Sequence, residues 1–598
     1  MSSQPFVYKP LLTSQTIRLL ILQPGSNDDP LVCVLEETTL LTNPGYEAIS
    51  YAWGDRKSDI KVGYGNNHVE VPYNLKLALL RFRRKDEPRR LWADSICINQ
   101  KNIVERNEQV KIMGKIYSSA MSVLIWLGEE NGETQLAYRC LEIFSEIPYK
   151  AQAGQKLDIP AADSLMCKAM RNLLARSWFK RAWTYQESAL AREVNGGKQG
   201  FIFCGSFVVT ADRMFAMALS SFYLSPLLRE RLGLGDPENP EYLGTMAKSI
   251  ARRFFRNQLS SCQLLDAICA IRGADCSDPR DLVYSIIGMD SEWETFEPDY
   301  ASPVEDVFSD FAKTVIKKYC NLDILDHVTS HRRESYANRN GPLPTWVPDW
   351  RDDRSSSYSL HVAHLGTGED SRKLYQATGS SCVAPGGPSN RNYLSVLGLR
   401  VDTVQEMCDS GPEGKLWMFA DQYLTASGLT YSHSQGQPSD HPHNYLYTGD
   451  DLPIAFLRLS TLDASIGYNG SRFDALAHFE KLNNDEYKAK FTDSIRRRQQ
   501  GRFLCFSRYS RIGLVPDDSQ AGDLICLLLG GSVPYILRPA GDKYIFIGEC
   551  FFLGLMDGEG LVEARKIADP TYNGEDISWL DRLHNEAVPF QAESFIIK

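Results

Sequence analysis

The chain has 598 residues, of which 43% are hydrophobic and 23% are charged, and its formal net charge is −10. This length predicts about two to four domains, and the composition excludes a largely disordered chain. The modest acidic charge excludes a protein built mainly to coat nucleic acid. No apolar run is long enough to span a membrane, and the N-terminus shows no secretory signal. We therefore expect a cytoplasmic protein that binds neither membrane nor nucleic acid.

Cysteine and histidine spacings point to neither disulfides nor a metal. The fourteen cysteines are spread evenly and include no Cys-x-x-Cys pair, which favours free, buried thiols in a reducing compartment. His361 and His364 are close in sequence, as are His441 and His443, but no cysteine pair accompanies them and we expect no zinc site. The phosphate-binding loop, the serine-hydrolase elbow and the zinc-protease motif are missing too, so no certain cofactor is identified.

Residues 1–205 are expected to form one α/β domain with a mostly parallel sheet and crossover helices. Short β-branched or leucine-rich runs predict strands, and longer runs with helical spacing predict helices between them. Continuous apolar strands that alternate with helices are typical of parallel sheets. The strand-rich segments are 17–23, 31–40, 46–55, 90–96 and 121–128, and the expected helices are 74–84, 103–120, 133–148 and 162–176.

Three further segments are expected after this domain. Residues 206–350 are predicted to be mainly helical and contain the sequence DPRDLVYSIIGM at 278–289. Residues 351–490 include stretches rich in Ser and Gly and are expected to form a loop-rich and helical connection. Residues 491–598 contain short strands roughly ten residues apart, separated by Gly and Pro, which predict a small β-barrel or meander.

Polar side chains cluster after the strand that is expected to end on Asp94. Asn99 and Gln100 follow shortly, at the edge where open α/β sheets bind ligands. Arg106 lies on the apolar face of the next helix. A buried guanidinium needs a carboxylate partner, and Asp94 is the nearest candidate in sequence. The cluster therefore has two interpretations, a structural Asp94–Arg106 lock or the wall of a binding site.

Helix initiation explains part of this polar richness. Asn102 directly precedes the helix expected at 103–120, and Glu105 follows three residues later. An asparagine followed at this spacing by a glutamate resembles a capping box, in which the two side chains bind free backbone amides of the first turn. These two residues are therefore expected to start the helix.

A second cluster, RSWFKRAWTYQE at 176–187, places charged residues among aromatic ones. Arg181 and Glu187 flank Trp183 in this segment. A carboxylate in an aromatic setting can have a raised pKa and can face a cationic substrate. Glu187 is accordingly interpreted either as one half of a structural ion pair or as a functional carboxylate.

Three blocks of the chain resemble the fungal heterokaryon incompatibility (HET) domain. They are YEAISYAWGD at 46–55, LWADSICINQKNIVERNEQVKIMGKIYSSAMSVLIWLG at 91–128 and RSWFKRAWTYQE at 176–187. DPRDLVYSIIGM, LPTWVPDW and the strand-rich C-terminal region resemble elements that follow this domain in such proteins. The resemblance is close to full-length. It implies a role in fungal non-self recognition, in which incompatible partners trigger growth inhibition or programmed cell death.

HET domains have been proposed to be distantly similar to Toll/interleukin-receptor (TIR) domains, some of which cleave the nicotinamide–ribose bond of NAD. In those enzymes a glutamate lies four residues after a tryptophan, on a helix beside the nucleotide pocket. Trp183 and Glu187 have this spacing, although Thr184 stands where the TIR motif has a cysteine. The resemblance thus implies Glu187 as the candidate catalytic residue of an NAD glycohydrolase-like activity, with NAD as substrate.

The same resemblance implies a set of substrate-binding residues. An arginine would meet the pyrophosphate as a bidentate donor, a tryptophan would stack on a ring, and the carboxylate would stabilise the oxocarbenium-like ribose. The set comprises Trp53, Asp94, Asn99, Gln100, Arg106, Arg181 and Trp183.

A second class of function is open on the sequence alone. The chain would then be a non-enzymatic signalling module that acts by self-association or through a protein partner. The two classes predict different structures. Catalysis requires a solvent-open site that unites Asp94, Arg106 and Glu187, whereas an interaction module would show these groups mutually satisfied and would expose apolar side chains.

Overall fold

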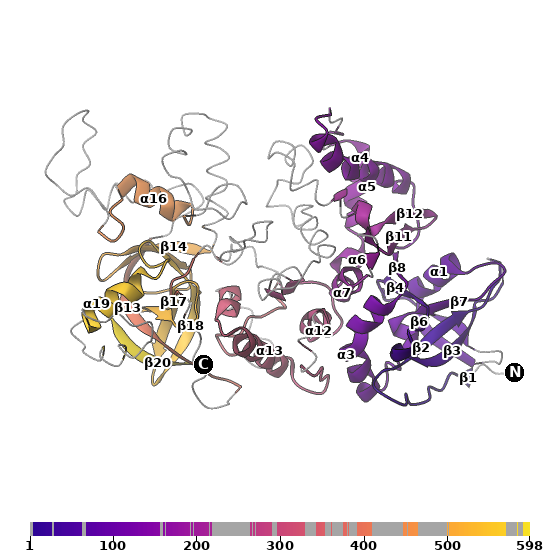
Figure 1. Cartoon of the computed structure of the whole chain (residues 1–598), viewed down its shortest axis with the longest axis horizontal. Coiled ribbons are helices and arrows are strands. Elements are labelled where there is room, and N and C mark those ends of the chain that lie inside the picture. The colour runs from indigo at the N-terminus through magenta and orange to yellow at the C-terminus, as the bar shows by residue number, and fades with distance from the viewer. Residues whose placement is uncertain are drawn as a thin grey trace. The chain divides into compact units, whose positions relative to one another are not determined.

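A computed structural model of the chain describes residues 4–217, 264–328, 343–352, 375–381, 391–408, 446–463, 499–569 and 580–598, with short gaps, together with Leu360 (Figure 1). The chain divides into two compact units, Met1–Pro303 and Val304–Lys598, and each is described by itself. The division into four segments stays a prediction. Within the described ranges, no helix combines the length and the apolar character needed to cross a membrane.

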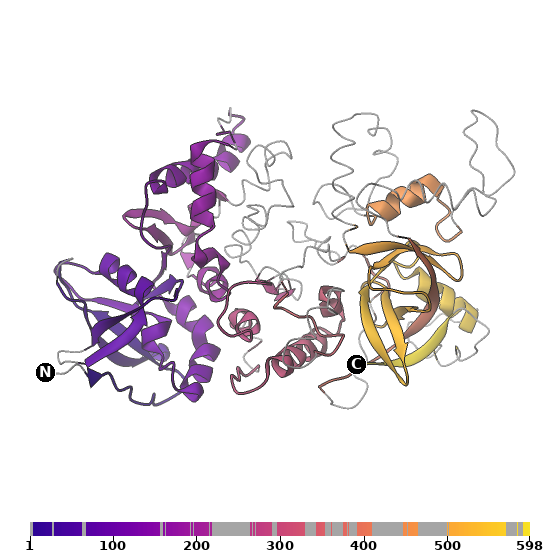
Figure 2. The same ribbon diagram turned by 180° about the vertical axis from the view of Figure 1, so that it is seen from behind.

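A ten-stranded mixed sheet forms the centre of the first unit (Figures 1 and 2). The strand order is β1-β6-β5-β3-β2-β7-β4-β8-β11-β12. The bounds are β1 Gln4–Pro5, β2 Thr16–Leu22, β3 Val32–Thr39, β4 Glu47–Tyr51, β5 Lys57–Val62, β6 Asn67–Pro72, β7 Arg89–Trp92, β8 Ser122–Trp126, β11 Gly200–Cys204 and β12 Phe207–Thr210. A separate two-stranded pair consists of β9 Glu193–Val194 and β10 Gly197–Lys198.

The expectation of a mostly parallel sheet is correct only in part, because the sheet is mixed. The pairs β4–β7, β4–β8 and β8–β11 are parallel, as are β3–β5 and β1–β6 nearer the other edge. The pairs β2–β3, β2–β7, β5–β6 and β11–β12 are antiparallel. Antiparallel neighbours can be joined by short turns, whereas parallel ones need a crossover. The short connections between β2 and β3, β5 and β6, and β11 and β12 therefore make the sheet mixed.

The helices of the first unit follow the predicted pattern closely. Their bounds are α1 Tyr73–Phe82, α2 Asp94–Cys97, α3 Ile103–Ser119, α4 Thr134–Gln152, α5 Leu165–Leu174, α6 Ser177–Lys180, α7 Trp183–Ala189 and α12 Asp281–Ile287. One expectation is wrong, because the strand that was to reach Asp94 ends at Trp92. Asp94 instead begins the short helix α2.

Helix α3 is held to the sheet by aromatic packing and by a buried ion pair. The rings of Trp92 on β7 and Tyr117 on α3 meet edge to face at 5.5 Å, and both side chains are almost fully buried. Arg18 on β2 forms a salt bridge of 2.5 Å with Glu105, and these two side chains are only 3% and 5% exposed. Buried charges of this kind are tolerated because each has a partner.

The capping prediction for α3 is half correct. The Asn102 side chain accepts hydrogen bonds from the backbone amides of Val104 and Glu105, at 3.1 and 3.2 Å. Glu105, however, binds Arg18 and accepts a hydrogen bond from the backbone amide of Asn99 at 2.7 Å. The glutamate thus closes the turn before the helix, because a buried arginine competes for its carboxylate.

A closed β-barrel forms the core of the second unit (Figure 2). The long strand β13 pairs with both β20 and β16, which closes a ring in the order β16-β17-β18-β20-β13. Strands β14, β15 and β19 extend from β13. The bounds are β13 Leu394–Cys408, β14 Arg502–Ser507, β15 Ile512–Pro516, β16 Leu524–Leu528, β17 Tyr535–Ala540, β18 Lys543–Glu549, β19 Phe551–Phe552 and β20 Gln591–Ile597.

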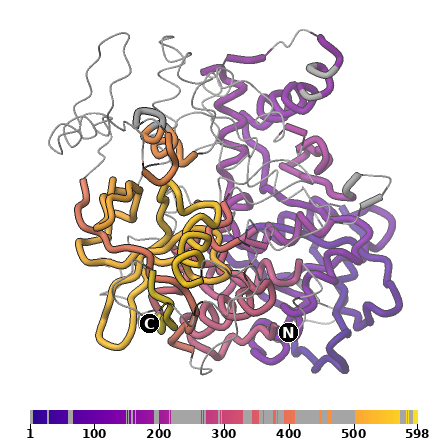
Figure 3. The backbone as a smooth tube through the Cα atoms, turned by 60° about the vertical axis from the view of Figure 1, so that its left-hand side comes forward, coloured from indigo at the N-terminus to yellow at the C-terminus, as the bar shows by residue number. Residues whose placement is uncertain are grey.

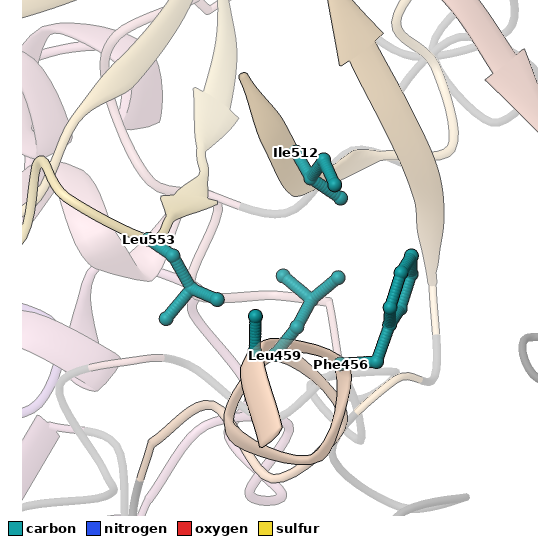
Figure 4. A pocket seen from close by; sticks show the side chains of 5 residues that line it. Phe456, Leu459, Ile512 and Leu553 are labelled. Carbon is teal, nitrogen blue, oxygen red and sulfur yellow. The ribbon is translucent and has the colours of Figure 1, made fainter. Parts of the chain in front are cut away.

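The core of the barrel holds buried Leu399, Ile525 and Ile536, and three helices of the second unit are described. They are α13 Val304–Tyr319, α16 Leu452–Ser460 and α19 Glu559–Ala568, and Figure 3 traces their chain path. Phe456 and Leu459 of α16 point toward Ile512 and Leu553 across a small apolar pocket (Figure 4). The barrel also includes β13, which precedes the β-rich segment expected at 491–598 by more than eighty residues.

Candidate functional site

The central parallel strands deliver candidate residues to one edge of the sheet. β4 ends at Tyr51 and β7 ends at Trp92, and these two strands run parallel. The residues that follow them, Trp53 and Asp94, therefore meet at the carboxyl ends of the strands. The indole Nε1 of Trp53 donates to both carboxylate oxygens of Asp94, at 3.2 and 3.0 Å.

Asp94 is buried and its carboxylate is surrounded by donors. The hydroxyl of Tyr51 donates to Oδ1 at 3.0 Å, and the backbone amide of Ser95 donates to the same atom at 2.7 Å. A guanidinium nitrogen of Arg181 lies 3.4 Å from Oδ2. The side-chain amide of Gln100 donates to the backbone carbonyl of Asp94 at 2.9 Å. These contacts fix the carboxylate in one orientation.

Arg181 occupies the turn between α6 and α7, where it pairs with Asp94 and feels the charge of Glu187. It donates to the backbone carbonyl of Tyr51 at 2.6 Å, and its guanidinium carbon lies 5.1 Å from the centre of the Trp53 ring. Burial alone would lower the pKa of Arg181, but the charges of Asp94 and Glu187 raise this pKa above its ordinary value. The guanidinium is therefore firmly cationic.

Glu187 lies on α7 and is only 1% exposed. The hydroxyl of Ser50 on β4 donates to its Oε2 at 2.5 Å. Ser50 in turn accepts a hydrogen bond from the indole of Trp178 at 2.8 Å. Burial, together with the charges of Glu187 and Asp94, raises the pKa of Tyr117 well above its ordinary value. Ser50 was not predicted as a site residue. A serine inside the otherwise apolar strand EAISY could have indicated a buried hydroxyl that needs a hydrogen-bond partner.

The predicted Asp94–Arg106 lock is wrong. Asp94 pairs with Arg181, and the guanidinium of Arg106 stacks on the ring of Tyr300 at 3.6 Å from its centre. On helix α3, Glu105 contacts Arg18 of β2. The next residue, Arg106, therefore lies on a different side of the helix, where it contacts Tyr300. Stacking on an aromatic face is an ordinary way to hold an arginine.

Asn99 and Trp183 have local structural contacts. The side-chain oxygen of Asn99 accepts from the backbone amide of Lys101 at 3.3 Å and closes the turn before α3. The indole of Trp183 is hydrogen-bonded to Asp281 on α12. Thr184, which occupies the cysteine position of the TIR motif, donates to the carbonyl oxygens of Trp178 and Arg181 at 2.8 and 2.7 Å and thereby ties α7 to α6.

Two buried carboxylates and one guanidinium therefore form the cluster, here named the Asp94–Arg181–Glu187 cluster. Asp94 and Glu187 are 7% and 1% exposed, while the side chain of Arg181 is 14% exposed and Trp53 is partly exposed. With Glu187 this deeply buried, a ligand reaches its carboxylate only if α7 moves.

Among the described residues no grouping of His, Cys, Asp and Glu could hold a metal ion. The histidine pairs His361/His364 and His441/His443 lie outside the described residues.

The described cysteines form no disulfide, in line with the expectation of thiols. Cys97, on the same short helix as Asp94, is an example of these buried free thiols. Burial raises its pKa to about 12, so this thiol stays protonated and inert at neutral pH.

Comparisons with known proteins agree with the sequence blocks. Residues 46–187 match the family model of the heterokaryon incompatibility protein (HET), and residues 466–568 match that of the Het-6 β-barrel domain. The chain is 24% identical to heterokaryon incompatibility protein 6, OR allele, of Neurospora crassa, over 91% of this chain and 94% of that protein. No solved structure gives a significant match. The chain therefore contains a region similar to the HET domain, followed by a region similar to the Het-6 β-barrel domain.

Proposed function

We propose that the protein is a cytoplasmic effector of heterokaryon incompatibility, whose HET domain drives growth arrest or cell death after non-self recognition. The observation that carries the proposal is the Asp94–Arg181–Glu187 cluster. Its members come from two blocks of the HET match that lie far apart in sequence, and Ser50 and Trp53 of the remaining block bind its two carboxylates. The similarity to a relative named for incompatibility supports the same role.

The geometry supports signalling through protein contact better than catalysis. Asp94 and Glu187 are buried and hydrogen-bonded within the cluster, as an interaction module requires. Two apolar side chains at the start of α3 are exposed, Ile103 by 52% and Val104 by 68%. Adjacent exposed aliphatic residues of this kind suit association with a second protein surface or a second copy of the chain.

The test is inducible expression in a fungal host, with growth as the readout. Wild type is expected to inhibit growth, and Arg181→Ala and Glu187→Ala are expected to abolish the inhibition, because each removes a buried charged member of the cluster. Glu108→Gln is the matched control, since Glu108 lies exposed on α3. Inhibition that survives both cluster variants at equal protein level would place the function outside the cluster.

A second candidate is cleavage of NAD, favoured by the placement of Arg181 between Asp94 and Glu187 and beside Trp53. A guanidinium and an indole at the rim would bind the pyrophosphate and a ring, and Glu187 would stabilise the ribosyl cation once α7 has moved. The test is incubation of purified protein with NAD. Nicotinamide release that disappears in Glu187→Gln supports this candidate, and equal release from both proteins rejects it.

A further inference from the structure

A segment beyond the HET match covers the helices that carry the cluster. Residues 275–289 and 296–300, here named the clamp, include α12, which packs against α7 beside α3 (Figure 1). The HET match ends at Glu187, so the clamp lies outside it. Both belong to the first compact unit. The clamp contacts the region of α7 at three places.

The first contact fixes the turn in front of α7. The backbone amide of Asp275 donates to the carbonyl of Lys180 at 2.8 Å, and the amide of Ala182 donates to the carbonyl of Asp275 at 3.1 Å. This short parallel bridge encloses Arg181. The turn that positions the guanidinium of the cluster is therefore held by the clamp.

The second contact joins side chains of the clamp to α7 and α3. The carboxylate of Asp281 binds the indole of Trp183 and accepts a hydrogen bond from the hydroxyl of Tyr300 at 2.5 Å. The ring of the same tyrosine stacks on Arg106 of α3. Tyr300 thus contacts α3 directly and is linked to α7 through Asp281.

The third contact is a close approach of two glycines. A Cβ on Gly114 of α3 would lie 2.0 Å from the carbonyl oxygen of Gly288, and a Cβ on Gly288 would lie 2.1 Å from Nε2 of Gln186 on α7. Gln186 is fully buried, and neither polar atom of its amide has a hydrogen-bond partner among the described residues. Leaving a buried amide unpaired costs free energy, so the closed arrangement carries a local strain.

We infer that the clamp is an autoinhibitory device that keeps α7 closed over the cluster. While it is in place, Trp183 and Gln186 are covered, and Glu187 stays buried against Ser50. Release of the clamp lets α7 move outward and exposes the Asp94–Arg181–Glu187 cluster to a partner. The inference rests on the proposed function, because it assigns the regulation of that same cluster.

Gly114→Ala in the full-length protein is the test variant. The added methyl group meets the backbone of Gly288 and wedges the clamp away from α3, whereas alanine is the better helix former within α3 itself. Ser118→Ala, at an exposed position of the same helix, is the control for helix propensity. Hydrogen exchange is expected to quicken about tenfold in peptides covering α7 and α12, and to stay unchanged in β8. Growth inhibition on inducible expression is expected to increase.

Tyr300→Leu is the second variant, because it removes both the stacking on Arg106 and the hydrogen bond to Asp281 without a new clash. It is expected to produce the same two changes. Unchanged exchange in α7 for both variants overturns the inference, since the clamp would then not hold this helix. Faster exchange with weaker or equal growth inhibition overturns it too, because the clamp would then support the active form.

The proposed function fails in a different way. If exchange quickens but neither wild type nor any variant inhibits growth, the incompatibility role is rejected, and with it the regulatory meaning of the clamp. If wild type inhibits growth and the clamp variants do not exceed it, the function stands and the autoinhibition is rejected.

Discussion

Ser50 donates a hydrogen bond of 2.5 Å to Glu187, although 137 positions separate the two residues in sequence. Ser50→Ala removes this donor and the acceptor of the Trp178 indole. Unmaking buried hydrogen bonds costs about 1–3 kcal/mol, so we expect the thermal transition of the first unit to fall. Ser118→Ala, on the exposed face of α3, should leave it unchanged. Equal transitions for both variants would show that Ser50 contributes nothing to stability.

The buried pair Arg18–Glu105 is expected to be much more sensitive than an exposed one. Glu105→Gln leaves Arg18 as a buried charge without a carboxylate, which typically costs about 3–5 kcal/mol. The matched control is Glu87→Gln, because Glu87 pairs with Arg84 on the surface and such pairs contribute about 0–1 kcal/mol. The loss of unfolding free energy in each variant is measured by urea unfolding and, separately, by hydrogen exchange in β2.

Asp281 predicts a specific dependence of stability on pH. Burial raises its pKa from 3.8 to about 6, despite the hydrogen bonds from Tyr300 and Trp183 that lower it. The folded carboxyl therefore binds its proton more tightly than the unfolded one, and its effect on stability is most favourable below pH 4. This contribution is lost as the pH rises from about 4 to 6, by roughly 3 kcal/mol.

Asp281→Asn removes this titration while it keeps an acceptor for the two donors. The unfolding free energy of wild type, relative to that of the variant, should decrease as the pH rises from about 4 to 7. Urea titrations at several pH values, with hydrogen exchange in α12 as the readout, provide the comparison. A difference that does not vary with pH would mean that this carboxyl titrates normally.

The cap of α3 provides a smaller test. Asn102→Ala removes the acceptor for the amides of Val104 and Glu105 and is expected to cost about 1 kcal/mol. Lys101→Ala, at the neighbouring exposed position, serves as the control. Faster exchange in the first turn of α3 for Asn102→Ala alone would confirm the cap.

The sequence predicts elements of this fold better than it predicts their partners. Helix α3 was expected at 103–120 and spans Ile103–Ser119, because the helical period is a local property of the chain. The partner of Asp94 was taken from the next helix, whereas Arg181 lies 87 residues away. Nothing local in the sequence encodes which of several arginines a carboxylate will meet.

The same limit applies to the core of the candidate site. Periodicity placed Arg106 on the apolar face of α3, but that face is shared by the sheet and by Tyr300. Glu105, which was expected to cap the helix, is the buried residue, since Arg18 on β2 is its partner. A charged residue becomes a core residue through a tertiary contact, and the helical wheel alone does not contain that contact.

Strand β13 determines when the barrel can close. Its first half, residues 394–400, pairs with β20, whose residues 591–597 follow it by nearly two hundred positions. Contacts between distant segments form late, because a long loop must first be ordered. During synthesis, the ring between β13 and β18 therefore stays open until residues 591–597 have left the ribosome. Chaperone dependence of the nascent chain is the expected cost of a barrel closed in this order.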